Sequence, residues 1–114
     1  MMRAFENRAD TVVWDEPLYG YYLHATGLEH PGAEKIMDAS GRCWQTVSEK
    51  ATGPIPHPAK IWYQKHMSQH LLDEVSRDWL DQVTNCFLIR EPIRVMAAYL
   101  QRREAATAAD LGFA

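Results

Sequence analysis

The stretch NCFLIREPIR, residues 85–94, decides how the chain is expected to fold, because it reads as a buried strand that turns directly into a helix. Cys86–Ile89 is a continuously apolar run, which fits a strand covered on both faces in a parallel sheet. Pro92 cannot continue a sheet but suits the first turn of a helix, and helical spacing of apolar residues follows it to about Ala105. This junction predicts an α/β fold.

An arginine stands at the junction itself. Arg90 follows the predicted strand, and in open α/β sheets ligands bind outside the carboxyl ends of the strands. The start of the next helix adds free N–H donors and a partial positive charge. Arg90 is therefore expected to hold an anion such as phosphate or sulfate. The alternative is an ion pair with Glu91, Glu16 or Asp15 that only fastens the junction.

Two further strands are predicted to end in charged or titratable residues. Thr11–Trp14 is a β-branched and aromatic run that stops at Asp15 and Glu16. Lys60–Gln64 reads as another strand, and it delivers Lys65 and His66 to its end. If these strands are parallel neighbours of the first, their carboxyl ends place carboxylates, a histidine with a lysine, and an arginine along one rim. Enzymes with α/β folds assemble their sites in this way.

The rest of the sequence supplies helices between the strands. Helices are predicted over residues 1–8, 19–28, 41–50 and 76–83, with Ser76 as the cap of the last one. Gly53–Pro58 has three prolines at alternate positions and is expected to be a stiff connector. The order α, β, α, α, β, α, β, α predicts a parallel sheet flanked by helices. Because three strands make a very small sheet, residues 1–114 are taken as a single, partial domain.

Composition and charge narrow the classes of function. The chain has 114 residues, a net charge of −3 and a pI near 5.9, which argue against a nucleic-acid binder. No apolar run is long enough to span a membrane, and the N-terminus lacks the apolar core of a signal peptide, so a cytoplasmic protein is expected. Cys43 and Cys86 form no C-x-x-C pair, and Cys86 is expected in the core.

The order and spacing of three parts of the sequence carry a family resemblance: residues 1–8 with 13–19, Lys65 with His66, and residues 88–95. In these parts the sequence resembles the P-loop sulfotransferases, and within them a bacterial group of sulfotransferase-like proteins. The first pair of segments looks like the helix after the phosphate loop and the second strand of that family. His66 looks like the catalytic histidine at a strand end, and residues 88–95 are similar to the arginine-led site for the nucleotide 3′-phosphate. The resemblance implies a partial P-loop NTPase-like fold, truncated at both ends.

The chain departs from the family pattern at several places. The phosphate loop of the family would lie before Met1, and the late Gly-rich segment of many members would lie beyond Ala114. Ala98 replaces a serine that often shares the 3′-phosphate. Gln64 replaces a lysine that many members carry two residues before the histidine, with Lys65 displaced by one position. As this fragment, the protein is expected to be incomplete or inactive.

The resemblance implies transfer of a sulfuryl group from 3′-phosphoadenosine 5′-phosphosulfate, the donor co-substrate, to a hydroxyl or amine of a small-molecule acceptor. His66 would be the general base. Arg90 would grip the 3′-phosphate of the donor, and Arg94, one helical turn on, would assist or face solvent. Asp15 and Glu16 would orient the acceptor or hold Arg90, unless they only stabilise the start of the following helix.

Two other classes of function stay open. A P-loop kinase-like phosphotransferase fragment would share the strand-end arginine and would prefer Mg-ATP. A non-catalytic remnant would persist as a homo-oligomer that pairs its open sheet edges. His66 and His70 have the spacing of a metal-binding helix pair, but Met67 stands where a zincin needs glutamate, so no metal site is predicted.

Overall fold

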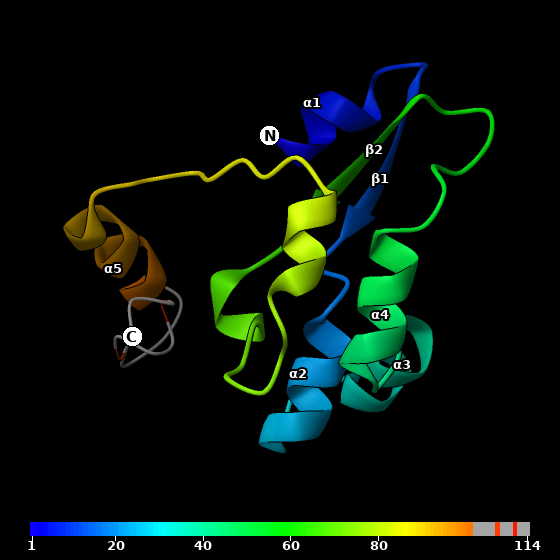
Figure 1. Ribbon diagram of the computed structural model, residues 1–114. Helices are drawn as coiled ribbons and strands as arrows, with labels where there is room; N and C mark the ends of the chain where they lie inside the picture. Colours follow the sequence, from blue (N-terminus) through cyan, green and yellow to red (C-terminus); the bar gives the residue numbers. More distant parts are fainter. Residues whose placement is uncertain (102–106, 108–110, 112–114) are drawn as a thin grey trace. The chain divides into compact units, whose positions relative to one another are not determined.

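The chain forms two compact units, Met1–Val83 and Thr84–Ala114, in a computed structural model that describes residues 1–101, 107 and 111 (Figure 1). Helices accompany a parallel sheet, so the α/β prediction is confirmed. In the described residues the sheet has two strands, whereas the sequence predicts three. The prediction of a single domain stays a prediction. None of the helices that the structure describes has the length and apolar character needed to cross a membrane.

The sheet of the first unit consists of β1 (Thr11–Asp15) and β2 (Ile61–Lys65), which run parallel. Both strands lie within one residue of their predicted bounds. The register sets the last residue of β1 beside the last residue of β2, so the carboxyl ends of the two strands coincide. The short helix α1 (Met2–Glu6) precedes β1. Phe5 of α1 stacks on Tyr63 of β2 with ring centroids 4.3 Å apart, and this contact fixes α1 on the sheet.

Three helices separate β1 from β2, namely α2 (Tyr19–Thr26), α3 (Ala33–Ser40) and α4 (Trp44–Ala51). The predicted helices over 19–28 and 41–50 correspond to α2 and α4. The sequence analysis misses α3, because Gly32 reads as a break and Gly41 is taken as the start of the next predicted helix. Both glycines have positive φ angles, of 82° and 89°, and close the helix at either end.

The helices α2 and α3 approach each other closely at Gly20. A Cβ atom built on Gly20 would lie 2.7 Å from the carbonyl oxygen of Gly41 and 2.9 Å from Cβ of Ser40. Only a residue without a side chain fits there. Arg42, just after α3, donates hydrogen bonds of 3.0 Å to the carboxylates of Glu34 in the first turn and Asp38 in the last turn of the helix.

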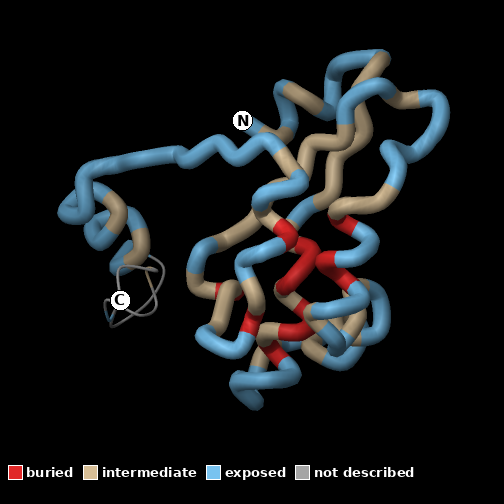
Figure 2. Tube along the Cα trace, viewed as in Figure 1, coloured by how far each residue is buried: buried red, intermediate tan, exposed pale blue. Residues whose placement is uncertain are grey.

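The core of the first unit is formed by side chains of α2 and its start, of α4, and of the segment from Val75 to Trp79, and Figure 2 shows these buried positions. It contains six buried side chains, namely Leu18, Tyr21, Val47, Ala51, Val75 and Trp79. Trp14 of β1 packs against this cluster and stacks on Trp62 with ring centroids 5.3 Å apart. Burial of these apolar and aromatic groups holds the carboxyl ends of β1 and β2 against the helices.

The region between β2 and the end of the first unit has two 3₁₀ helices, η1 (Ser68–His70) and η2 (Asp78–Gln82). The predicted α-helix over 76–83 is therefore wrong in type and begins too early. The Ser76 hydroxyl donates to Asp78 Oδ2 at 2.8 Å and accepts from the Asp78 backbone N–H at 3.2 Å. This local turn competes with an α-helical first turn.

In the second unit, residues 84–91 are extended without strand pairing and α5 (Pro92–Leu100) follows. The predicted buried strand over Cys86–Ile89 is wrong. Phe87, Leu88 and Ile89 are 85%, 82% and 89% exposed, and Cys86 is an exposed free cysteine rather than a core residue. An apolar run becomes a buried strand only when neighbouring strands and helices cover it. The predicted helix from Pro92 is confirmed to Leu100, and residues 102–105 lie outside the described residues.

Candidate functional site

Charged side chains meet where β1 and β2 end. The backbone N–H of Glu16 donates to the carbonyl oxygen of Lys65 at 2.8 Å, which continues the pairing of the strands by one residue. The Lys65 ammonium donates to Asp15 Oδ1 at 3.2 Å and to Glu16 Oε1. Partial burial opposes the charge of Lys65, but the two carboxylates outweigh burial and raise its pKa. The cation that holds these carboxylates in the first unit is thus Lys65, which the sequence analysis places on this rim while it considers Arg90 as their partner.

The backbone at Glu16 is unusual. Its φ angle is 48°, in the left-handed region that favours glycine. Pro17 and Leu18, which follow it, are almost fully buried, so the chain turns sharply from the strand into the core. This conformation points the backbone of Glu16 at β2 and its carboxylate at Lys65.

His66 follows β2 immediately and lies beside this charged cluster in the sequence. Its Nε2 lies 3.2 Å from Oε1 of Gln64, and its ring lies 5.4 Å from the ring of Trp79. Its Nδ1 is buried and has no hydrogen-bond partner among the residues that the structure describes. Burial, with a smaller effect of His70, lowers the pKa of His66 to about 4. The imidazole is therefore neutral near pH 7 and keeps a lone pair.

His70 is a buried neighbour that the sequence analysis considers only as a metal ligand. It is 3% exposed, and its ring stacks on Tyr19 and lies against Tyr22, with centroids 5.0 and 4.8 Å away. Burial lowers its pKa, while Glu16 raises it and Lys65 lowers it to smaller extents. The spacing of Tyr19 and Tyr22 on one face of α2 is the signal that could have indicated these aromatic contacts.

His66 and His70 do not have the geometry of a metal-binding helix pair. His70 lies in the 3₁₀ helix η1 and His66 lies before it, so the two do not share one face of an α-helix. Over the described part of the chain, no three His, Cys, Asp or Glu side chains are grouped as metal ligands.

The guanidinium of Arg77 fixes the loop after η1 by donating to the carbonyl oxygens of Leu71 at 2.7 Å and Leu72 at 2.8 Å.

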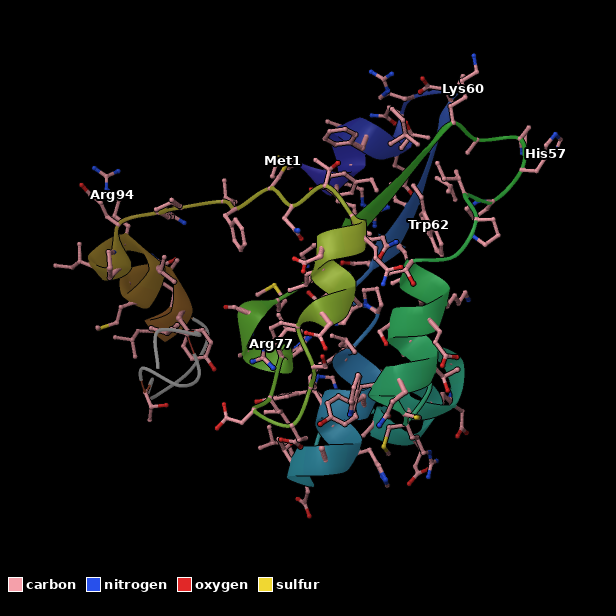
Figure 3. The ribbon with its side chains drawn as sticks, in the orientation of Figure 1. Met1, His57, Lys60, Trp62, Arg77 and Arg94 are labelled. Carbon is pink, nitrogen blue, oxygen red and sulfur yellow. The ribbon has the colours of Figure 1, made fainter. Side chains whose placement is uncertain are left out.

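The two predicted phosphate-binding arginines belong to the second unit. Arg90 is exposed and stands two residues before the first residue of α5. Arg94 lies in the first turn of α5, where Figure 3 shows its side chain directed away from the helix. Its Nε donates to Glu91 Oε2 at 2.8 Å, and its side chain stays 70% exposed. Two guanidinium groups at a helix start can hold a phosphate.

Comparison with known proteins decides the family. The family model described as "Sulfotransferase domain" matches residues 1–114, which is the whole chain. The chain belongs to the sulfotransferase domain family. The resemblance noted in the sequence is therefore confirmed for this sulfotransferase-domain chain. No solved structure matches it significantly, so the P-loop NTPase-like fold has no support from structural neighbours.

Two curated relatives of the sulfotransferase-domain chain come from Arabidopsis thaliana. They are named branched-chain-amino-acid aminotransferase-like protein 1 and protein 2. Each is 28% identical over 102 residues, which cover 87% of this chain and 18% of the relative. The chain thus spans about a fifth of the length of these relatives.

Proposed function

We propose that this chain is part of a sulfotransferase with a partial P-loop NTPase-like fold. The reaction is transfer of a sulfuryl group from 3′-phosphoadenosine 5′-phosphosulfate to a hydroxyl or amine of a small acceptor. The observation that carries the proposal is His66, a neutral histidine at the carboxyl end of a parallel strand with an unpartnered, buried Nδ1 among the described residues. The match of the sulfotransferase domain model to the whole chain supports the reaction class.

In this function His66 is the general base. Its lone pair takes the proton of the acceptor group as the acceptor oxygen or nitrogen forms a bond to sulfur. The bond between sulfur and the phosphate oxygen of the donor breaks, and the electron pair leaves with 3′-phosphoadenosine 5′-phosphate. The pKa near 4 keeps the ring unprotonated at neutral pH, so the lone pair is available before the acceptor arrives.

Arg90 and Arg94 are the proposed contacts to the 3′-phosphate of the donor. Both lie at or just before the first turn of α5, where the N–H groups have no partner within the helix. Arg94 also pairs with Glu91, so a bound phosphate competes with a carboxylate for that guanidinium. Arg90 is the stronger candidate, because no ion pair of Arg90 occurs among the described residues.

Asp15 and Glu16 are proposed to orient the acceptor beside His66. Asp15 has the more accessible carboxylate, since its side chain is 53% exposed whereas that of Glu16 is 28% exposed. Glu16 contributes mainly by holding Lys65 at the strand ends. An acceptor amine or hydroxyl can donate to Asp15 Oδ2 while Oδ1 accepts from Lys65.

Nucleotide binding tests the proposal. The 114-residue chain is titrated by calorimetry with 3′-phosphoadenosine 5′-phosphate and, separately, with Mg-ATP. The proposal expects tighter binding of the 3′-phosphorylated nucleotide; a preference for Mg-ATP supports a phosphotransferase instead. The variant His66→Ala should keep the nucleotide affinity and lose transfer, with the exposed His24→Ala as the matched control. If the parent chain transfers sulfuryl groups, equal turnover of His66→Ala removes His66 from the mechanism.

The aminotransferase-like names of the two relatives are not carried over to this chain. The matched part is 18% of each relative, so a name given to the whole relative need not describe the matched part. An assay for amino transfer by the 114-residue chain is a direct check, and it is expected to be negative.

A further inference from the structure

Gln64 connects the candidate base to the end of α4. Its side-chain Nε2 donates to the backbone carbonyl oxygen of Ala51 at 2.7 Å. Its Oε1 lies 3.2 Å from Nε2 of His66. The amide is partly buried and lies in β2, so the strand itself fixes where the amide can reach. One side chain thus contacts both a helix end and the imidazole.

These two contacts determine where the proton of the imidazole lies. A carbonyl oxygen only accepts hydrogen bonds, so the NH₂ group of Gln64 must face Ala51. The amide oxygen of Gln64 then faces His66, and an amide oxygen also only accepts. Nε2 of His66 must therefore carry a hydrogen. A neutral imidazole has one N–H, so the lone pair resides on Nδ1.

We infer that Gln64 is a positioning residue that holds His66 as the Nε2–H tautomer, so that Nδ1 is the atom that accepts the acceptor's proton. The inference rests on the proposed function of His66 as general base. In the transfer step, the Nδ1 lone pair takes the acceptor proton while Nε2–H stays hydrogen-bonded to Gln64. The resulting imidazolium has both nitrogens protonated, and the sulfur–oxygen electron pair leaves with the nucleotide.

The burial of Nδ1 defines what the acceptor must do. Nδ1 has no partner among the described residues and is enclosed, with the ring of Trp79 against the imidazole. An acceptor reaches Nδ1 only after neighbouring side chains move aside. Gln64 holds the ring through the other nitrogen, so the imidazole keeps its tautomer and its orientation during that movement.

The tautomer is measured by NMR of the ¹⁵N-labelled 114-residue chain, without donor or acceptor. The two-bond and three-bond couplings of the ring protons tell a protonated nitrogen from a bare one. We expect a protonated Nε2 and a bare Nδ1 for His66. The variant Gln64→Leu should show a mixture of tautomers, whereas Gln64→Glu should keep the Nε2–H tautomer and raise the pKa of His66. The exposed Gln101→Leu is the matched control and should change neither.

The Nδ1–H tautomer in the parent chain, or an unchanged tautomer in Gln64→Leu, overturns the inference. These outcomes do not depend on nucleotide binding, so they are separate from failure of the proposed function. If the chain transfers sulfuryl groups, Gln64→Leu should lower kcat by at least about tenfold with little change in KM for the donor, and Gln64→Glu should recover part of it. If the role of Gln64 is purely structural, Gln64→Leu should not lower kcat selectively over KM and should not change the tautomer of His66.

Discussion

Lys65 lies in register with Asp15 at the carboxyl ends of two parallel strands, and its ammonium contacts the Asp15 carboxylate at 3.2 Å. The residues are 50 positions apart in the sequence, so only the parallel pairing of β1 with β2 brings them together. Glu16 adds a second carboxylate from a left-handed backbone conformation. The candidate site is therefore built where the carboxyl ends of the two strands are linked by ion pairs.

The left-handed conformation of Glu16 leads to a paired prediction on stability. Glu16→Ala and Glu16→Gly both remove the carboxylate, but glycine alone tolerates a φ of 48° without steric cost. The glycine variant should therefore be more stable than the alanine variant by about 1 kcal/mol. Urea unfolding of both variants measures this difference. Equal stabilities would mean that the backbone at residue 16 relaxes out of this conformation.

The depressed pKa of His66 predicts that acid destabilises the first unit. The ordinary pKa is 6.5 and the folded value is about 4, so between these limits the unfolded chain binds a proton that the folded chain does not. Stability should therefore fall as pH decreases from about 6.5 to about 4, by up to about 3 kcal/mol. His70, whose pKa burial also lowers, should add to the same trend.

The measurement for His66 is urea unfolding at several pH values across that window. His66→Gln removes one titrating group and should flatten the pH dependence. His24→Gln, at an exposed position of α2, is the control and should keep the slope of the parent. A slope that survives in His66→Gln would assign the effect to other titrating groups, of which His70 is the nearest with a lowered pKa.

Arg90 is predicted to recognise the 3′-phosphate of the nucleotide. Arg90→Gln should weaken binding of 3′-phosphoadenosine 5′-phosphate by about 10- to 100-fold, the size expected for a hydrogen bond to a charged group. Binding of adenosine 5′-monophosphate, which lacks the 3′-phosphate, should not change. Arg42→Gln, which removes an arginine paired with Glu34 and Asp38, is the control. An equal loss for both nucleotides would show that Arg90 acts on another part of the ligand.

The close approach of α2 and α3 predicts that Gly20 cannot be replaced. In Gly20→Ala the new Cβ would lie 2.7 Å from the backbone oxygen of Gly41, so the helices must separate, at a cost of about 1–3 kcal/mol. Gly32→Ala is the comparison, because its Cβ would have nothing within 4 Å and only the φ of 82° opposes it. That variant should lose about 1 kcal/mol. Thermal unfolding of the two variants gives the ranking.

The sequence predicts those parts of the fold that have a strong local pattern. The β-branched and aromatic residues of β1 and the apolar spacing of α2 give both elements, and the polar residues after each strand place Asp15, Glu16 and His66 at one rim. Whether the arginines join that rim stays a prediction. The contacts of Lys65 and Gln64 could not be predicted, because they depend on strand register and on a helix end far away in the sequence.

The failed strand and the missed helix have different physical causes. Residues 86–89 have a strand pattern, but a pattern of four apolar residues does not say whether neighbours cover it. In α3 the glycines at both ends act as helix caps, whereas in the sequence Gly32 looks like a break and Gly41 like the start of the next helix. The strand error thus comes from missing tertiary neighbours, whereas the helix error comes from local capping.

The exposed run of Phe87, Leu88 and Ile89 also predicts where proteases cleave the chain. A protease binds an extended backbone with accessible side chains, and residues 84–91 have that conformation while the core of the first unit does not. Brief digestion with chymotrypsin should cut first after Phe87 or Leu88 and release a fragment close to the first unit. If that fragment retains cooperative unfolding, the base and the arginines can be prepared and studied as two separate pieces.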